Sequence, residues 1–445
     1  MIRLTGRALA LIALAAFPAV ALAQREPPDT KETKEANKFL GVAMLRQNPA
    51  DKKPQYEQAL KQLQVGMAKN PTNAKVWLLA GQVYVGLGDF MAADSAFKKA
   101  EELYPGYAEN VSGEREVAWV EAFNAGISAM DQQNAEEAIR QLEMAELMYA
   151  HRPEAKMNLG ALYASKSESD KAIAIFEKAI ESTNGPLREK LSPEDAANWQ
   201  RYADMAQLNI AQIIGSRGVE QFEAEQHDQA IASFAKAAEI NPHSRDYLFN
   251  LAQSYYAKTS AIEEKRTALL EEQDALTKAK KTAEAKAKAD EAAQLGEQLK
   301  PLFAEIVKIS ERTMLLDPAN ESLYHLVARS HRVTADVSTT EAEKASWQNK
   351  ALEVLKKREE LQFEVSDLGI QPGDGEATIR GSVKNLKATP GSPIKLRLTL
   401  VNPSGATIGT QEITVTAPAA DQSTTFEGKT PITGEIAGWK YEVVK

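Results

Sequence analysis

Small residues recur along the chain at a fixed interval, and each is followed four positions later by a large apolar residue. The interval is 34 residues from Ala59 to Ala93 and from Ala138 to Ala172. It grows to 45 between Ala93 and Ala138, and to 58 between Ala172 and Ala230. Around these positions apolar residues repeat every three or four residues, which predicts amphipathic helices. The pattern therefore predicts helix pairs that approach closely at small residues and bury their apolar faces by stacking.

The clearest copy of this unit is Ala74–Tyr107, where large residues occupy positions 4, 11 and 24 and small residues occupy positions 8, 20 and 27. Its signature residues are Trp77, Gly81, Tyr84, Gly88, Ala93, Phe97, Ala100 and Pro105. This helix–turn–helix resembles the tetratricopeptide repeat (TPR). The resemblance covers five good copies and two weaker ones within residues 36–362. It implies a mainly α fold, a TPR α-solenoid.

A charged segment, residues 259–300, interrupts the sixth copy and is rich in Ala, Glu and Lys. Apolar residues repeat every seven positions from Ile262 to Ala283, and with alternating gaps of three and four from Ala292 to Ile309. Both series are heptad seams. Because the two registers do not join, the pattern predicts an inserted antiparallel coiled-coil hairpin that turns within Thr282–Ala289. One unbroken helix is the alternative.

Helical periodicity ends near Phe363, and short alternating segments separated by Gly- and Pro-containing turns follow. The predicted strands are Phe363–Gly369, Glu376–Asn385, Pro393–Val401, Thr407–Thr416, Ser423–Lys429 and Trp439–Val444. This spacing fits an all-β immunoglobulin-like sandwich over residues 363–445. The segment also resembles the FxLYD-type domain of bacterial envelope proteins, through Gly381–Asn385, the turn Asn402–Gly405, Phe426 and Trp439–Val443. That resemblance implies a small accessory binding or spacing domain without catalytic residues.

The N-terminal segment, residues 1–23, has a cationic start, the apolar stretch Ala8–Val20 and an Ala-Leu-Ala site. These features are typical of a secretory signal peptide that is cleaved after Ala23. No transmembrane segment is expected after this cleavage, and residues 24–35 are expected to form a flexible lead-in. The pattern favours export to the periplasm or cell envelope of a bacterium.

Composition and motifs argue against several kinds of chemistry. The chain has no cysteine, which excludes thiol catalysis and thiolate metal sites, and its formal net charge is −9. Nucleic acid is therefore a poor candidate partner. The five histidines lack the spacing of a shared metal site, and neither a nucleophile elbow nor a phosphate-binding loop is present in the sequence. We expect no catalytic residue, no metal, no cofactor and no enzymatic activity.

The first helix of each TPR lines the concave surface of the solenoid, and the resemblance maps partner-binding positions onto this chain. These residues are Leu78, Val85, Phe123, Ile127, Met130, Met157, Val219, Phe222, Phe249 and Tyr256. Their mostly apolar character favours binding of an extended or helical peptide segment. Two alternatives remain open: the residues pack between repeats, or an inserted helix at Pro186–Ile210 covers the groove.

The sequence thus predicts a non-enzymatic protein–protein interaction scaffold whose concave face binds segments of other envelope proteins. One alternative is an accessory protein that binds cell wall or polysaccharide through the β-sandwich. Another is a structural protein that self-associates through the hairpin. The sequence does not predict the partner, the pathway or the oligomeric state.

Overall fold

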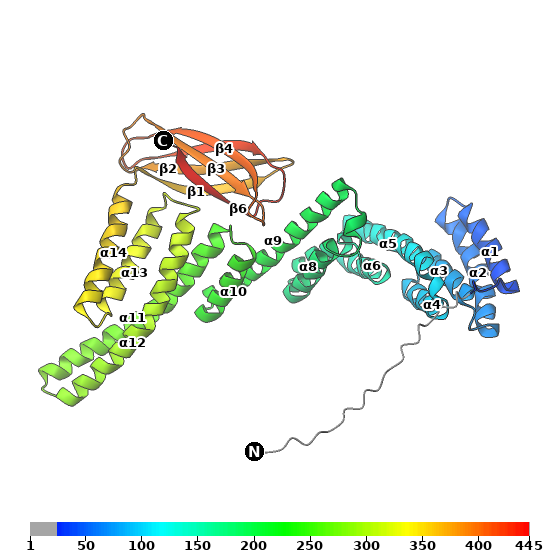
Figure 1. Ribbon diagram of the computed structural model, residues 1–445, viewed down its shortest axis with the longest axis horizontal. Coiled ribbons are helices and arrows are strands. Elements are labelled where there is room, and N and C mark those ends of the chain that lie inside the picture. Colours follow the sequence, from blue (N-terminus) through cyan, green and yellow to red (C-terminus); the bar gives the residue numbers. More distant parts are fainter. Residues whose placement is uncertain (1–24, 445) are drawn as a thin grey trace, which may run out of the picture. The chain divides into compact units, whose positions relative to one another are not determined.

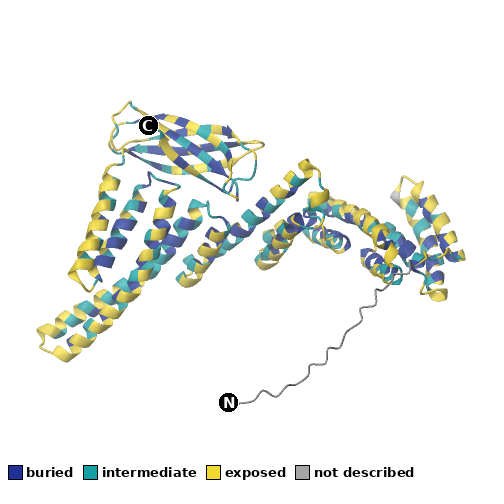
Figure 2. Ribbon diagram, viewed as in Figure 1, coloured by how far each residue is buried: buried dark blue, intermediate teal, exposed yellow. Residues whose placement is uncertain are grey.

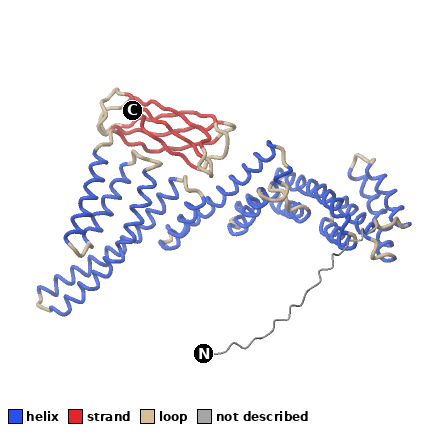
Figure 3. Tube along the Cα trace, in the orientation of Figure 1, coloured by secondary structure: helices blue, strands red, loops and turns tan. Residues whose placement is uncertain are grey.

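The computed structural model describes residues 25–444, so the predicted signal peptide lies outside the described residues. The chain divides into two compact units, Met1–Ala150 and His151–Lys445. The described part of the N-terminal unit contains three helix pairs. The C-terminal unit contains four helix pairs followed by six strands (Figure 1, Figure 3).

The helices of the N-terminal unit are α1 (Lys31–Met44), α2 (Pro49–Lys69), α3 (Ala74–Leu87), α4 (Phe90–Leu103), α5 (Ala108–Asp131) and α6 (Ala135–Met148). Those of the C-terminal unit are α7 (Glu154–Ser165), α8 (Ser169–Thr183), α9 (Pro193–Glu223), α10 (His227–Ile240), α11 (Arg245–Lys278), α12 (Thr282–Met314), α13 (Glu321–Asp336) and α14 (Glu341–Glu359). Odd-numbered helices are the first members of the pairs and even-numbered helices are the second members.

Five of the seven described pairs, α1–α2 to α9–α10, contain the small-residue contact that the sequence predicts. The five alanines that define the interval are fully buried: Ala59, Ala93, Ala138, Ala172 and Ala230. A glycine in the first helix faces a large side chain of the second, so that a Cβ at Gly160 would lie 2.5 Å from Cε1 of Phe176. Buried residues follow the faces where helices meet (Figure 2). The predicted array of helix pairs is confirmed.

One turn geometry joins the first helix to the second in five of the pairs. A single residue takes a left-handed conformation, as in Gly88 (φ 77°) and Lys280 (φ 58°). The N–H of the next residue donates to the carbonyl five residues earlier, for example Lys281 to Leu276 at 2.9 Å. This is the usual left-handed C-terminal cap of a helix. The same geometry recurs at Gln133, Ser167 and Glu225.

The hairpin between α11 and α12 is therefore an oversized repeat closed by the ordinary repeat turn. The antiparallel hairpin is confirmed, but it turns at Ala279–Lys281 and not within the predicted Thr282–Ala289. No glycine marks this turn, because Lys280 itself adopts the left-handed conformation. A lysine at this position does not indicate a turn, so the sequence pattern could not locate it.

The other two insertions lengthen first helices in the same way. Helices α5 and α9 have 24 and 31 residues, compared with 14 in α3. The expected separate helix at Pro186–Ile210 is wrong, because α9 begins at Pro193 and continues unbroken to Glu223. Ser192 caps this helix, with its hydroxyl accepting from the Asp195 N–H at 3.1 Å.

The structure also differs from the expected flexible lead-in at residues 24–35. Helix α1 begins at Lys31 because Thr30 and Thr33 form a reciprocal capping box. The preceding residues are held as well. Asp29 pairs with Lys75 at 2.9 Å, and the carbonyl of Pro28 accepts from Nδ2 of Asn73 at 3.0 Å.

The six strands form two three-stranded antiparallel sheets with the orders β1-β2-β5 and β4-β3-β6. Side chains of both sheets share one core, which includes Ile379, Val383, Leu396, Leu398 and Phe426. The strands are β1 (Phe363–Pro372), β2 (Glu376–Asn385), β3 (Pro393–Val401), β4 (Thr407–Thr416), β5 (Ser423–Pro431) and β6 (Gly438–Val444). They follow the predicted strands closely, since turns with Gly or Pro separate them.

Buried polar contacts fix this sandwich to the ends of the helices (Figure 1). The hydroxyl of Tyr441 donates to Oδ1 of Asp317 at 2.7 Å and accepts from the N–H of Ala319 at 3.0 Å. Arg245 of α11 pairs with the other oxygen of Asp317 at 2.8 Å. Nδ2 of Asn241 donates to the carbonyl of Ala437 at 2.7 Å. The sandwich and the last repeats therefore form one unit.

The small-residue contact can be tested with two glycines of α5. A Cβ at Gly126 would lie 2.7 Å from Cγ of Leu142, whereas a Cβ at Gly113 would meet no atom within 4 Å. Gly126→Ala is expected to lower the free energy of unfolding by about 1–3 kcal/mol through overpacking. Gly113→Ala is expected to raise it by about 0.5–1 kcal/mol, because it removes helix-interior glycine. Urea unfolding monitored by tryptophan fluorescence measures both, and equal effects would contradict the packing argument.

The sandwich junction can be tested with two tyrosines. Tyr441→Phe removes both hydrogen bonds of a buried hydroxyl and is expected to cost about 1–3 kcal/mol of unfolding free energy. Tyr324→Phe is the matched control, since that half-buried hydroxyl makes one bond, to the carbonyl of Pro318 at 2.9 Å. Its cost is expected to be about 1 kcal/mol. A cost for Tyr441→Phe no larger than that of the control would show that the junction contributes little.

Candidate functional site

Three of the predicted contact residues have little accessible surface. Leu78, Val85 and Met157 are all buried. The first turns of α5 lie beside α3, where Nε2 of Gln82 donates to Oε1 of Glu114 at 2.7 Å. These three side chains pack between helices, as the first alternative reading of the sequence has it, and offer no contact surface.

The predicted residues of α5 and α9 are more exposed than Leu78, Val85 and Met157. Phe123, Ile127 and Met130 of α5 are half-buried, and Phe123 stacks on Trp119 with ring centroids 4.8 Å apart. Val219 of α9 is 40% exposed. Phe222 is half-buried and packs beside the ring of His227.

The last two predicted residues, Phe249 and Tyr256, lie together in a hollow that we call the α11–α13 groove. It encloses about 660 Å³ between two first helices and strand β1. Its lining residues include Arg245, Phe249, Gln253 and Tyr256 of α11, Ser322, His325, Leu326 and Arg329 of α13, and Glu364–Leu368 of β1. The positions that the TPR resemblance assigns to the concave surface thus line one hollow in two consecutive repeats.

The cations of this groove are held by carboxylates. The guanidinium of Arg329 lies 4.6 Å from the ring centroid of Tyr256 and pairs with Glu263 at 3.0 Å. Arg245 pairs with Asp317. Between them, Phe249 and Leu326 provide an apolar strip. The groove therefore offers an apolar floor with fixed polar groups at its sides.

Strand β1 supplies the third wall, and its irregular backbone shapes that wall. The register of β1 against β2 shifts between Ser366 and Gly369, and Asp367 has a φ of 52°. Asp367 and Leu368 consequently lie outside the β1–β2 ladder. Such a bulge re-aims side chains and interrupts regular pairing along an edge strand. Sequence reasoning missed this wall, because a contact between residues more than a hundred positions apart leaves no local signal.

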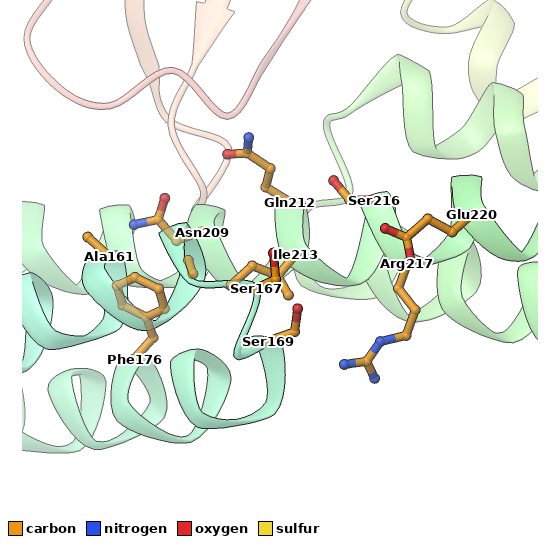
Figure 4. Close-up of a pocket in the computed structure, with 11 residues that line it drawn as sticks. Ala161, Ser167, Ser169, Phe176, Asn209, Gln212, Ile213, Ser216, Arg217 and Glu220 are labelled. Carbon is orange, nitrogen blue, oxygen red and sulfur yellow. The ribbon is translucent and has the colours of Figure 1, made fainter. Parts of the chain in front are cut away.

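A second hollow, of about 560 Å³, lies between α7, α8 and α9. Figure 4 shows Gln212, Ser216 and Glu220 of α9 on one side of this space, and Ser167, Ser169 and Phe176 on the other. Its polar residues Asn209, Gln212, Ser216 and Glu220 follow one another at spacings of three and four, so the sequence carried a signal that the TPR mapping passed over. Arg217 at its edge pairs with Asp170 at 2.7 Å.

Metal and membrane sites are not evident in the part of the chain that the structure describes. Within residues 25–444, no group of three or more His, Cys, Asp or Glu side chains could hold a metal ion. No helix in the same range is long and apolar enough to cross a membrane.

Comparison with known families agrees with the helix pairs. Residues 74–107 and residues 123–186 each match a family model described as tetratricopeptide repeat. The chain contains tetratricopeptide repeats. Proteins with this fold typically serve as non-catalytic interaction scaffolds, and no catalytic family is indicated. No curated protein matches the chain.

Several solved TPR structures are similar at low identity. MamA is 20% identical with a TM-score of 0.21, over 48% of this chain and 94% of MamA. The TPR domain of P58(IPK) is 12% identical with a TM-score of 0.21, over 73% of this chain and 99% of that domain. YrrB, described as a TPR protein with an unusual peptide-binding site, is 15% identical with a TM-score of 0.20, over 52% and 91%. Because these TM-scores are low, the TPR assignment is based on the family models and the helix pairs alone.

Glu364 provides a pH test of the groove. Burial raises the pKa of its carboxyl, and the nearby charges of Glu321 and Asp317 raise it further. An acid with a raised pKa in the folded state lowers stability once pH rises past its unfolded pKa, near 4.3. Glu364→Gln is therefore expected to raise the melting temperature at pH 7 and to leave it unchanged at pH 3.

The opposite sign is expected at Glu427, which serves as the control. A hydrogen bond from Arg380 lowers the pKa of Glu427, so its stabilising contribution is present at neutral pH and is lost as pH falls. Glu427→Gln should slightly lower the melting temperature at pH 7. Shifts of the same sign in both variants at pH 7 would refute this view of the groove electrostatics.

Proposed function

We propose that the protein is a non-enzymatic scaffold of the bacterial periplasm or cell envelope that binds segments of partner proteins in the α11–α13 groove. The observation that carries the proposal is the convergence of concave positions from two consecutive repeats, Phe249 and Gln253 with His325 and Arg329, on one hollow. The volume of the groove, 660 Å³, lies within the range of about 300–1,000 Å³ typical of ligand sites. The predicted signal peptide supports the location.

The chemistry of the groove favours an extended peptide segment with a large apolar side chain. That side chain would pack between Phe249 and Leu326, which desolvates it at the groove floor. Gln253 and Ser322 offer hydrogen bonds to the peptide main chain. A peptide bound in this way contacts α11, α13 and β1 together, so its recognition depends on the whole C-terminal unit.

The proposed role of residues 363–445, as an FxLYD-like accessory domain, is to form the β1 wall of this groove. The buried junction at Tyr441 supports that role, since it fixes the sandwich against the helices that carry the other two walls. A domain held in this way differs from a free spacer. Its removal would leave the groove that Phe249 and Leu326 line without its β1 wall.

The polysaccharide alternative is less well supported, because sugar binding by stacking needs an exposed aromatic face. The sandwich sequence contains four aromatic residues. Phe363, Phe426 and Tyr441 are buried. Trp439 is half-buried, with the guanidinium of Arg245 5.8 Å from its ring centroid. None of these four aromatic side chains is fully exposed, as a platform for a sugar ring would be.

Self-association through the hairpin also lacks a suitable surface. Its heptad seams face each other, and Leu269, Ala285, Ala292 and Leu299 are buried between α11 and α12. Residues 259–300 are all described, and none of the large apolar side chains among them is exposed. The seam that could pair with a second copy is already occupied within the chain.

Photo-crosslinking tests the proposed function. A benzoylphenylalanine placed at Gln253, inside the groove, is expected to give an adduct with a discrete partner in cells. The same residue placed at Lys236, exposed on α10, is expected to give none. Phe249→Asp should reduce the Gln253 adduct more than tenfold, because it puts a charge on the apolar floor.

Val219→Asp is the matched control for that substitution, since Val219 is an exposed first-helix residue outside the groove. It should leave the Gln253 adduct unchanged. An adduct that survives Phe249→Asp, or that Val219→Asp abolishes equally, would exclude the groove as the binding site.

A further inference from the structure

The tip of the α11–α12 hairpin differs in charge from the rest of the chain. Residues 278–288 carry one acidic residue, Glu284, and five lysines: Lys278, Lys280, Lys281, Lys286 and Lys288. All of these lysines except the half-buried Lys288 are exposed. The whole chain, by contrast, has a formal net charge of −9. The tip is therefore a basic point on an acidic protein.

Lys281 occupies a position that the backbone disfavours for a cation, and Lys280 takes a conformation that the backbone disfavours for any side chain. Lys280 takes the left-handed conformation that glycine adopts without strain, and Lys281 is the N-cap of α12, where the helix dipole repels positive charge. The four equivalent turns carry neutral or acidic residues at these two positions: Gly88-Asp89, Gln133-Asn134, Ser167-Glu168 and Glu225-Gln226. Only the α11–α12 turn has lysines at these two positions, and a departure from the local preference in one of five equivalent turns points to a role beyond stability.

The charge at the tip is only partly neutralised within the hairpin. Lys281 lies 3.1 Å from Glu284, Lys288 lies 3.0 Å from Glu272, and Lys278 pairs with Asp274. Among the residues that the structure describes, no carboxylate lies within ion-pair distance of Lys280 or Lys286. Exposed pairs of this kind are weak and are readily exchanged for an external anion.

The hairpin also holds the tip away from the body of the C-terminal unit. Gly296 of α12 still packs against Val337, the residue that follows α13, and lies beside Arg266 of α11. Beyond this level, α11 continues from Arg266 to Lys278, about 18 Å at the rise of an α-helix. The tip points away from the sandwich, which lies at the opposite ends of α11 and α12 (Figure 1).

We propose that the hairpin tip docks the protein on an anionic bilayer surface. The tip offers lysine ammonium groups on flexible stems, with neither an arginine fork nor an aromatic platform, and such point charges suit a diffuse layer of lipid headgroups. Nucleic acid or a structured acidic protein would instead be recognised through stacking, bidentate pairs or a groove. Because the rest of the chain is acidic and is repelled by the same surface, the tip alone approaches it, and binding orients the protein.

Vesicle sedimentation of the purified full chain tests the proposal. The protein is expected to bind vesicles of phosphatidylcholine with about one third phosphatidylglycerol at low ionic strength, and to be released at about 0.5 M salt. Each lysine near an anionic surface strengthens partitioning about fivefold. The variant Lys278→Gln/Lys280→Gln/Lys281→Gln/Lys286→Gln should therefore partition at least about a hundredfold more weakly.

The matched control removes the same charge from exposed lysines elsewhere in the C-terminal unit. Lys166→Gln/Lys178→Gln/Lys236→Gln/Lys308→Gln should leave vesicle binding within about fivefold of the original protein, because these residues lie away from the tip. An equal loss in both variants would show a general charge effect and would overturn the proposal.

A second variant separates the charge of the tip from its folding. Lys280→Gly/Lys281→Asp copies the Gly88-Asp89 turn, so it should stabilise the hairpin while it weakens vesicle binding by about a hundredfold through three units of charge. Vesicle binding that survives this substitution would overturn the proposal. So would equal binding to phosphatidylcholine alone, or binding to polyglutamate or DNA without binding to anionic vesicles.

Discussion

The close approach of the two helices in each pair is the contact on which the rest of the structure depends. Neither Gly126 nor Gly160 has room for a side chain, since Leu142 and Phe176 already fill the space a Cβ would need. Ala138 and Ala172, on the facing helices, are fully buried. Small residues and not long side chains therefore set the distance between the helices at this contact. Pairs built on the same contact can stack on one another even where their helices differ in length.

That constraint explains how the chain accommodates its insertions. An inserted segment cannot enter the contact between two helices, so it lengthens a helix beyond the contact. Helices α5 and α9 grow at their N-terminal ends, whereas α11 and α12 grow together and remain closed by the ordinary repeat turn at Lys280. The same physical rule thus produces both a longer first helix and a projecting hairpin.

The sequence predicted what depends on local periodicity and failed where distant segments meet. The alanine interval gave the helix pairs, and the alternation around Leu396 and Leu398 gave the strands, because both patterns are set by which face of an element is buried. The turn at Lys280 was misplaced, since a left-handed residue other than glycine has no sequence signature. In the candidate site, Phe249 and Tyr256 followed from the TPR mapping, but the β1 wall did not. Leu78 and Val85 are buried, which the TPR mapping did not predict, because it is based on positions within one repeat and does not include the neighbouring helices.

The end of the repeat array shows why the sandwich matters for the groove. Helix α14 buries Ala351 alone among its residues, as expected of a last helix that faces solvent. The sandwich does not continue the stack and packs instead on the turns, through Tyr441, Asp317 and Arg245. Arg245 also lines the α11–α13 groove, so one buried ion pair links the sandwich junction to the groove wall. A change at the junction is therefore expected to alter the shape of the groove without touching its floor, which makes the sandwich part of the proposed binding surface.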